Sequence, residues 1–263
     1  MFNAALERDK IIAWIRDWFE KNGKGCNAVL GISGGKDSTV VAALCNEALG
    51  AERVIGVMIP NGVQHDIRDS LEVCTCLGIQ YLTCNIKNAY QSILDEIHQG
   101  VDMTPHGFYI GSNLLKPIEP SKQTIENLPP RLRMATLYAV SQSMNGRVAN
   151  TCNLSETMIG WETKWGDAVG DFAPLAKYTA TEVIEIGKTI DYIPRHLVEK
   201  APSDGLCGKT DEDAFGFTYK ALDSYLRTGT SGNEEDDKKI AYKIKNSEFK
   251  RKPTECCPGP TTE

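Results

Sequence analysis

The sequence predicts an α/β protein with a doubly wound, mainly parallel sheet and helices on both faces. Short apolar segments alternate along the chain with longer segments of helical periodicity, as in a sheet whose parallel strands are joined by helices. Several helical segments stop at a glycine, and a polar cluster directly follows the first apolar segment. Because ligands in such sheets bind beyond the carboxyl ends of the strands, we expect a binding site at that cluster.

The elements alternate in order after an N-terminal helix. This helix is expected over residues 1–22, where apolar side chains form a helical stripe. The expected strands are residues 28–33, 53–60, 79–86 and 147–153. The expected helices are residues 37–49, 66–77, 88–99, about 130–145, 179–190 and 211–227. Thr179 and Glu182 fit a capping box at the start of one of them.

Other stretches lack periodicity. Residues 101–121 gather glycine and proline and are expected to form a loop or lid, and residues 161–178 are typical of a binding loop. Residues 229–239 are expected to be solvated, and residues 246–263 to be a tail with little helix. We find no internal repeat, so residues 1–263 are expected to form a single domain.

Composition narrows the class of protein. With 41% apolar and 24% charged residues the chain has the makeup of a globular protein, and a net charge of −6 does not favour wholesale nucleic-acid binding. No apolar run approaches the roughly 20 residues of a membrane helix, and the N-terminus is too charged for a signal peptide. We therefore expect a cytoplasmic protein with neither a membrane nor a nucleic-acid partner, whose cysteines are mostly small core residues.

The polar cluster is S-G-G-K-D-S at residues 33–38, between a strand and a helix. Backbone N–H groups and the helix dipole would face an anion there, and the glycines permit close approach. The spacing differs from the G-x-x-x-x-G-K-[ST] loop of common nucleotidases. Asp37 suits an anion site only when a cation bridges it, which predicts a Mg²⁺ ligand. The alternative is a glycine-rich turn capped by Asp or Ser.

This segment resembles the pyrophosphate loop of the N-type ATP pyrophosphatases, which have an adenine-nucleotide α-hydrolase-like, Rossmann-like fold. Three later segments resemble NAD synthetases: ENLPPRLRMATLYAVSQ, NTCNLSETMIGWETKWGDAVGDFAPL and EKAPSDGLCGKTDEDAFGFTYKALDSYL. The resemblance covers most of residues 27–227. It implies a ligase that uses ATP and Mg²⁺ to amidate deamido-NAD through an adenylated intermediate, giving NAD, AMP and pyrophosphate. Because the chain has no room for a glutaminase domain, the ammonia-dependent form is expected.

The resemblance also implies roles for individual residues. Asp37 and Glu156 would hold Mg²⁺, and Asp167 would position ammonia or be a turn residue. The residues implied in ATP binding are Gly31, Ile32, Ser33, Gly34, Gly35, Lys36, Asp37, Ser38, Thr151 and Ser203. Those implied in deamido-NAD binding are Arg131, Lys164, Asp171 and Lys250. Lys36 occupies the variable position of the loop, so its charge is expected to help without being required.

The chain departs from the family pattern at two positions. Ala180 replaces a lysine that contacts ATP, with Lys177 nearby, and Phe249 replaces a histidine that reaches the substrate. Two alternatives remain open: a tRNA-thiolating enzyme of the same superfamily and a non-catalytic nucleotide-binding protein. The family resemblance further implies a homodimer, for which the apolar faces of the N-terminal helix and of residues 134–140 are candidate surfaces.

Overall fold

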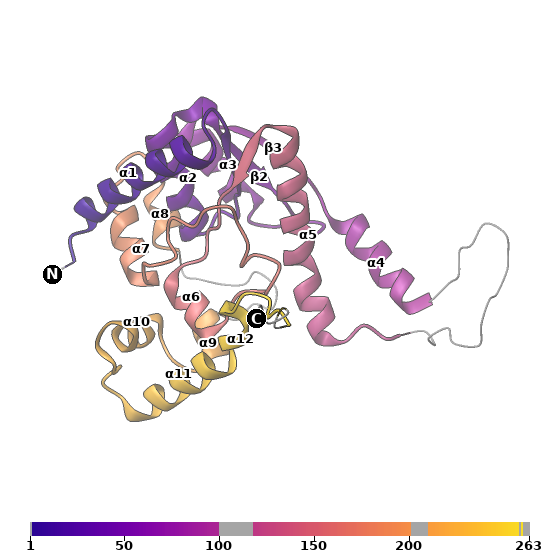
Figure 1. The fold of residues 1–263 in the computed structure, drawn as a ribbon, viewed down its shortest axis with the longest axis vertical. Coiled ribbons are helices and arrows are strands. Elements are labelled where there is room, and N and C mark those ends of the chain that lie inside the picture. The colour runs from indigo at the N-terminus through magenta and orange to yellow at the C-terminus, as the bar shows by residue number, and fades with distance from the viewer. Residues whose placement is uncertain (1, 100–117, 201–209, 258, 260–263) are drawn as a thin grey trace.

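The computed structural model describes residues 2–99, 118–200, 210–257 and 259 (Figure 1). Its sheet is built from β1 (Asn27–Gly31), β2 (Val54–Met58), β3 (Gln80–Thr83) and β4 (Gly146–Val148). The strands lie in the order β3-β2-β1-β4, and every neighbouring pair is parallel. The predicted parallel α/β fold is therefore confirmed. The chain moves outward from β1 to β3 and then returns to β4 on the other side of β1, which makes the β1/β4 boundary the switch point of the sheet.

The helices join and flank these strands. The longer ones are α1 (Ala4–Asn22), α2 (Lys36–Leu49), α3 (Ile67–Leu77), α4 (Lys87–Gln99), α5 (Lys122–Ser143), α10 (Tyr219–Thr228) and α11 (Glu234–Asn246). The shorter ones are the 3₁₀ turn η1 (Ala51–Arg53), α6 (Leu154–Ile159), α7 (Ala180–Gly187), α8 (Arg195–Val198), α9 (Asp211–Phe215) and α12 (Glu248–Arg251). No helix in the described ranges has the length and apolar character needed to cross a bilayer.

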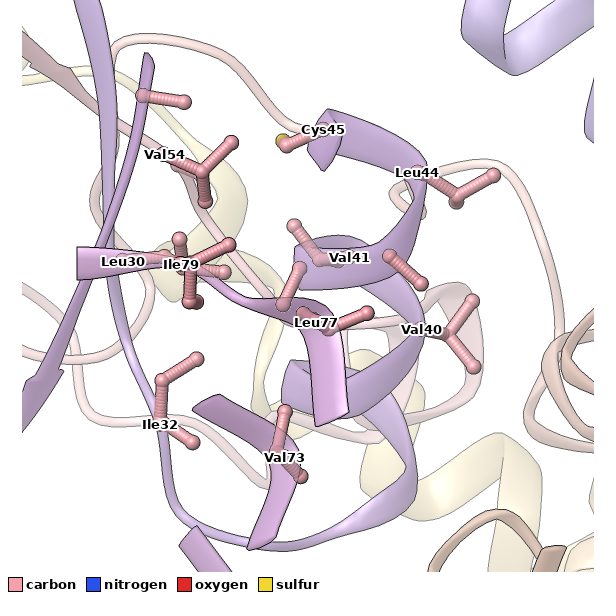
Figure 2. Close-up of a cluster of buried hydrophobic side chains, with 14 of the residues drawn as sticks. Leu30, Ile32, Val40, Val41, Leu44, Cys45, Val54, Val73, Leu77 and Ile79 are labelled. Carbon is pink, nitrogen blue, oxygen red and sulfur yellow. The ribbon is translucent and has the colours of Figure 1, made fainter. Parts of the chain in front are cut away.

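Both faces of the sheet are covered. Along β1, Ala28 and Leu30 point into a core formed with α1, α2, α3, α7 and α8, whereas Val29 points into a second core formed with α5. Figure 2 shows Leu30 and Val54 of the sheet facing Val41 and Cys45 of α2. The alternation along β1 places helices on opposite faces, as the doubly wound prediction requires.

A third apolar cluster lies at the end of the molecule away from the sheet, where Figure 1 shows α10 and α11. Its buried members include Ile159 of α6, Phe215 of α9, Leu222 of α10 and Ile240 of α11. These helices pack on one another and on the start of α7. The cluster therefore fixes the position of α6, which carries part of the candidate site.

Two element predictions were wrong in detail, and helix α11 was not predicted, although residues 229–239 are mostly exposed as expected. Helix α5 begins at Lys122, capped by the Ser121 hydroxyl, and runs through Pro129 and Pro130, although the sequence suggested a start at about residue 130. The helix expected over 211–227 is two helices, because Gly216 has φ +79° and ends α9. Residues 234–246 form a helix whose four acidic first-turn side chains suit its dipole and whose Ile240 is fully buried.

Two predictions lie wholly or largely outside the described residues. Ser203 is in the range 201–209, and most of the expected loop or lid at 101–121 is in the range 100–117. The irregular character predicted for residues 161–178 is confirmed, since they contain no helix and only one isolated bridge, from Ala149 to Phe172.

Candidate active site

A cavity of about 690 Å³ lies at the carboxyl ends of β1, β2 and β4. Its wall includes the end of β1 and the loop after it (Gly31, Ile32, Ser33, Gly35), and residues beyond β4 (Ala149, Asn150, Thr151). The lining also includes residues from the segment after β2 and from α5, among them Gln64 and Arg133. The cavity is therefore at the switch point, where a doubly wound sheet binds its ligand.

Hydroxyl groups fold the loop between β1 and α2. The Ser33 hydroxyl accepts the Gly35 N–H at 3.2 Å and lies 3.0 Å from the Ser38 hydroxyl, while Ser38 and Thr39 both donate to the Gly35 carbonyl. Thr39 is fully buried. These bonds hold the loop in one shape. The N–H groups at the start of α2 then point toward the cavity, which Gly35, Lys36 and Asp37 line.

Gly34 is needed for packing. It has φ +77°, and a Cβ there would lie 2.6 Å from Asp69 Cβ and 2.9 Å from the backbone nitrogen of Ser70. Gly34 and Ser38 are not among the described residues that line the cavity. Gly34 seats the loop against α3, and Ser38 holds its shape through the hydroxyl bonds to Ser33 and Gly35.

The two predicted metal ligands lie close together. Asp37 is in the first turn of α2 and Glu156 in the first turn of α6, and both line the cavity. Asn153 links them: its side-chain amide donates to Asp37 Oδ1 at 3.0 Å, and its Oδ1 accepts the Glu156 N–H at 3.1 Å. Each carboxylate is largely buried, with 18% of the Asp37 side chain and 17% of the Glu156 side chain exposed.

Lys36 lies between these carboxylates. Its Nζ is 2.6 Å from Asp37 Oδ2 and 3.8 Å from Glu156 Oε1, and its side chain is 3% exposed. Burial alone would lower the pKa of Lys36, but the charges of Asp37 and Glu156 outweigh it and raise that pKa. Burial, reinforced by the charge of Asp37, raises the pKa of Glu156. The three groups therefore interact electrostatically as one cluster.

Two further predicted residues line the same cavity. Thr151 follows β4, and Asp167 lies in the irregular segment beyond it. Asp167 Oδ1 accepts the Thr163 N–H at 2.9 Å, and the Asp167 carbonyl accepts from the Asn150 amide and the Cys152 thiol. The side chain keeps solvent-accessible surface inside the cavity, yet the protein around it desolvates the carboxylate and raises its pKa.

The residues predicted to bind deamido-NAD lie elsewhere. Arg131 is exposed and its Nε donates to the Lys164 carbonyl at 3.4 Å, while Lys164 Nζ donates to the Phe249 carbonyl at 2.8 Å. Lys250 Nζ donates at 2.7 Å to the carbonyls of Gly160 and Glu162. These residues gather around the C-terminal segment and are not among the described residues that line the cavity.

Asp171 is placed at the edge of the sheet. Its Oδ2 accepts the Val148 N–H at 2.7 Å, and its Oδ1 accepts the Tyr138 hydroxyl at 3.3 Å. Asp171 thus lies beside α5, whose residues around 134–140 were noted as an apolar face.

Several residues at the site were not predicted from the sequence, among them Asn153, Lys200 and Arg133. Asn153 could have been found, because an Asn three residues before Glu156 fits a capping box. Lys200 lines the cavity and donates to Asp66 at 3.2 Å and to Asp69 at 2.7 Å; it begins the K-A-P-S stretch of a matched segment. Arg133 lines the cavity and donates to the Ile59 carbonyl at 3.0 Å, and only the fold brings it there.

Ala180, one of the two departures from the family pattern, is not among the described residues that line the cavity. Ala180 is buried in the third apolar cluster, and its N–H donates to the Ser155 hydroxyl. Lys177, considered as a substitute for the missing lysine, is exposed and is not among the described residues lining the cavity.

The two tryptophans of the irregular segment differ in their surroundings. Trp161 packs edge-on against Phe215, with ring centres 4.6 Å apart, whereas Trp165 is 57% exposed and Lys164 Nζ lies 5.2 Å from its ring centre.

Comparisons with known proteins identify the family of this chain. A family model described as NAD synthase matches residues 7–254. A curated NH(3)-dependent NAD(+) synthetase from Thermococcus kodakarensis is 37% identical over 226 residues, covering 86% of this chain and 80% of the relative. An NMN synthetase structure from Francisella tularensis superposes with a TM-score of 0.82 at 30% identity, covering 98% of this chain and 99% of that one.

A second solved structure, an NH3-dependent NAD synthetase from Campylobacter jejuni, superposes with a TM-score of 0.73 at 25% identity and covers 98% of this chain and all of that one. The chain is accordingly an enzyme, a ligase that forms a C–N bond. With the strand order, the loop after β1 and these matches in agreement, the chain belongs to the NAD synthase family.

Proposed function

We propose that the chain uses ATP to amidate deamido-NAD with ammonia, giving NAD, AMP and pyrophosphate. Relatives named NH(3)-dependent NAD(+) synthetase cover most of the chain, which supports both the product and the nitrogen source. The observation that carries the proposal is the convergence of Asp37 and Glu156, from distant parts of the sequence, on one positive group at the head of the loop.

The two carboxylates fit a Mg²⁺ ion. Both offer hard oxygen donors, and in the structure both already face a cation, the Lys36 ammonium. The described residues contain no group of three or more His, Cys, Asp or Glu side chains that could hold a metal. A pair suffices for Mg²⁺, which keeps waters and substrate phosphates among its ligands. Asp37 and Glu156 would hold the ion, and when bound it would offset negative charge on the ATP phosphates.

The reaction requires a better leaving group than a carboxylate oxygen. The nicotinate carboxylate attacks the α-phosphate of ATP and pyrophosphate leaves; ammonia then attacks the acyl carbon and expels AMP. The N–H groups at the start of α2 bind the departing pyrophosphate, and Thr151 contacts ATP. Arg133 and Lys200, which line the cavity, supply positive charge around the phosphates.

We assign the ammonia step to Asp167. Its carboxylate lies in the wall of the cavity and is held by the Thr163 N–H. Because its pKa is raised, this carboxylate is a stronger base than an ordinary aspartate. Asp167 orients ammonia and takes the proton that is lost as the amide forms.

The dinucleotide is proposed to bind along Arg131, Lys164 and Asp171, with its nicotinate carboxylate reaching into the cavity. Arg131 and Asp171 are exposed, and a guanidinium can pair with a phosphate through two hydrogen bonds. We further propose a homodimer that covers part of this region, next to α5. A stable monomer in sedimentation at working concentration would contradict the dimer.

A second candidate substrate is the mononucleotide form, nicotinate mononucleotide. It is favoured by the close superposition of an NMN synthetase over nearly all of both chains. The amidation is the same, and only the adenylate half of the substrate is missing.

The test is to measure AMP, pyrophosphate and amide product with ATP, Mg²⁺ and ammonium chloride. We expect equal amounts of all three with deamido-NAD, and no product when glutamine replaces ammonium. A faster reaction with nicotinate mononucleotide would select the second candidate. ATP binding without turnover on either substrate would contradict the enzymatic proposal.

A further inference from the structure

Lys36 is an unusual residue for the place it occupies. It is the first residue of α2, where the helix dipole disfavours a positive charge, and its side chain is 3% exposed. It lies in a cluster of acidic groups: Asp37 and Glu156 as described, and Asp211, whose negative charge also acts on it. The carboxylates that the proposed function assigns to the divalent cation are therefore the groups that keep this ammonium buried.

The geometry of Lys36 matches that of a bound cation. Its Nζ lies within ion-pair distance of both carboxylates at once, 2.6 Å from Asp37 and 3.8 Å from Glu156. The ring of Tyr219 closes a further side, with its centre 5.4 Å from Nζ. The Tyr219 hydroxyl donates to Asp211 at 3.0 Å, which fixes the ring. The ammonium is thus enclosed by groups that each favour positive charge.

We propose that Lys36 is a tethered cation that pairs with Asp37 and Glu156 in the nucleotide-free chain, and that a divalent cation binds there by displacing it toward the ATP phosphates. This inference rests on the proposed function only for the identity of the cation ligands. It goes beyond the expectation that the charge of Lys36 helps without being required.

The charge of Lys36 determines how the divalent cation and ATP affect each other's binding. With Lys36 in place, one ammonium faces two carboxylates, and adding a divalent ion brings two positive groups within a few ångströms of each other. The phosphates of ATP remove this conflict, because the displaced ammonium gains an anionic partner of its own. The free chain therefore binds the divalent cation weakly, and ATP and the cation bind cooperatively.

The experiment measures Mn²⁺ binding to the nucleotide-free protein by electron paramagnetic resonance. K36Q keeps the length and polarity of the side chain but loses the charge, so we expect it to bind Mn²⁺ about tenfold more tightly than wild type or better. K36R keeps the charge and is expected to bind as weakly as wild type. The double variant K36Q/D37N is the matched control. Because it also lacks the charge of Asp37, we expect the gain in Mn²⁺ affinity to disappear.

The outcomes separate this inference from the proposed function. If wild type binds Mn²⁺ with ATP but K36Q alone shows no gain, the tethered-cation inference is wrong while the cation ligands stand. If neither protein binds Mn²⁺ with or without ATP, the ligand assignment is wrong and the inference falls with it.

A second measurement needs no variant. Reductive methylation of wild type, read by mass spectrometry, is expected to label Lys36 slowly in the free chain and several-fold faster once saturating Mg²⁺ displaces its ammonium. Equal rates would overturn the inference even where K36Q does not fold.

Discussion

The side-chain amide of Asn153 lies 3.0 Å from Asp37 Oδ1, so the residue that caps α6 also holds the carboxylate at the start of α2. Asn153 is fully buried, and its side-chain oxygen, Oδ1, accepts the N–H of Glu156. One side chain thus sets the separation of the two proposed metal ligands, which come from segments more than a hundred residues apart.

Replacing Asn153 by Ala should damage stability and turnover together. Loss of the cap costs about 0.5–2 kcal/mol, and loss of a hydrogen bond to a charged group about 1.5–3 kcal/mol. We expect the free energy of unfolding to fall accordingly in denaturant titrations, and pyrophosphate release to fall at least about tenfold, since Asp37 loses its orientation.

Thr179→Ala is the matched control. Thr179 caps α7 through the same kind of capping box but has no contact with Asp37 among its hydrogen bonds in the described structure. It should lose stability by the cap alone and keep its turnover. Similar turnover losses in both variants would show that capping, and not the Asp37 contact, matters.

Asp37→Asn should leave the fold intact and abolish Mg²⁺-dependent turnover. The amide keeps the size of the side chain and can still contact Asn153, but it removes the charged oxygen that suits a divalent cation. We expect pyrophosphate release to drop by about 10²-fold or more at any Mg²⁺ concentration, with an unchanged circular dichroism spectrum. Asp95→Asn, on the exposed surface of α4, is the control. Near-normal turnover of D37N would remove Asp37 from the metal site.

Gly34→Ala tests the seat of the loop on α3. A non-glycine residue at φ +77° costs about 1–3 kcal/mol, and the added Cβ would also clash with Asp69 and Ser70. Gly232 has a similar φ of +87° but nothing within 4 Å of the added Cβ, so Gly232→Ala bears the conformational cost alone. We expect G34A to be the less stable variant in denaturant titrations and to bind ATP more weakly in calorimetry. Equal losses of stability would show that packing on α3 is unimportant.

The framework of the site could be predicted from the sequence because its signals are local. A strand, two glycines and a helix start at residues 27–38 fix where the loop lies, and the alternation of strands and helices fixes the sheet around it. The start of α5 was missed because Pro129 and Pro130 are normally found at helix starts, yet here the preceding residues continue the helix to the Ser121 cap.

The convergence of the site was harder to predict. Nothing in the local sequence tells that Arg133 and Lys200 meet in one cavity, since that depends on how α5 and the segment after α8 cross the sheet. The burial of Lys36 depends in the same way on Glu156 and Tyr219 from other elements. Residue type and spacing identify candidates, whereas tertiary contacts decide which of them share a site.

Lys250 is expected to stabilise the fold by binding backbone carbonyls after α6, and not to bind the substrate. Its ammonium donates at 2.7 Å to the carbonyls of Gly160, the C-cap of α6, and Glu162, where a positive charge also suits the helix dipole. Lys250→Ala should therefore lower the free energy of unfolding by about 1–3 kcal/mol. The KM for the dinucleotide should rise no more than the KM for ATP.

Lys252→Ala is the control that distinguishes the loss of the Lys250–carbonyl hydrogen bonds from a general effect of charge near the C-terminal segment. Lys252 is exposed and pairs through its side chain only with Glu248 within the described residues, so its loss should change stability by less than about 0.5 kcal/mol. The two lysines are only two positions apart in the sequence. A stability loss seen in K250A and not in K252A would therefore come from the carbonyl contacts of Lys250. A K250A protein of normal stability with a raised KM for the dinucleotide alone would instead return Lys250 to the substrate site.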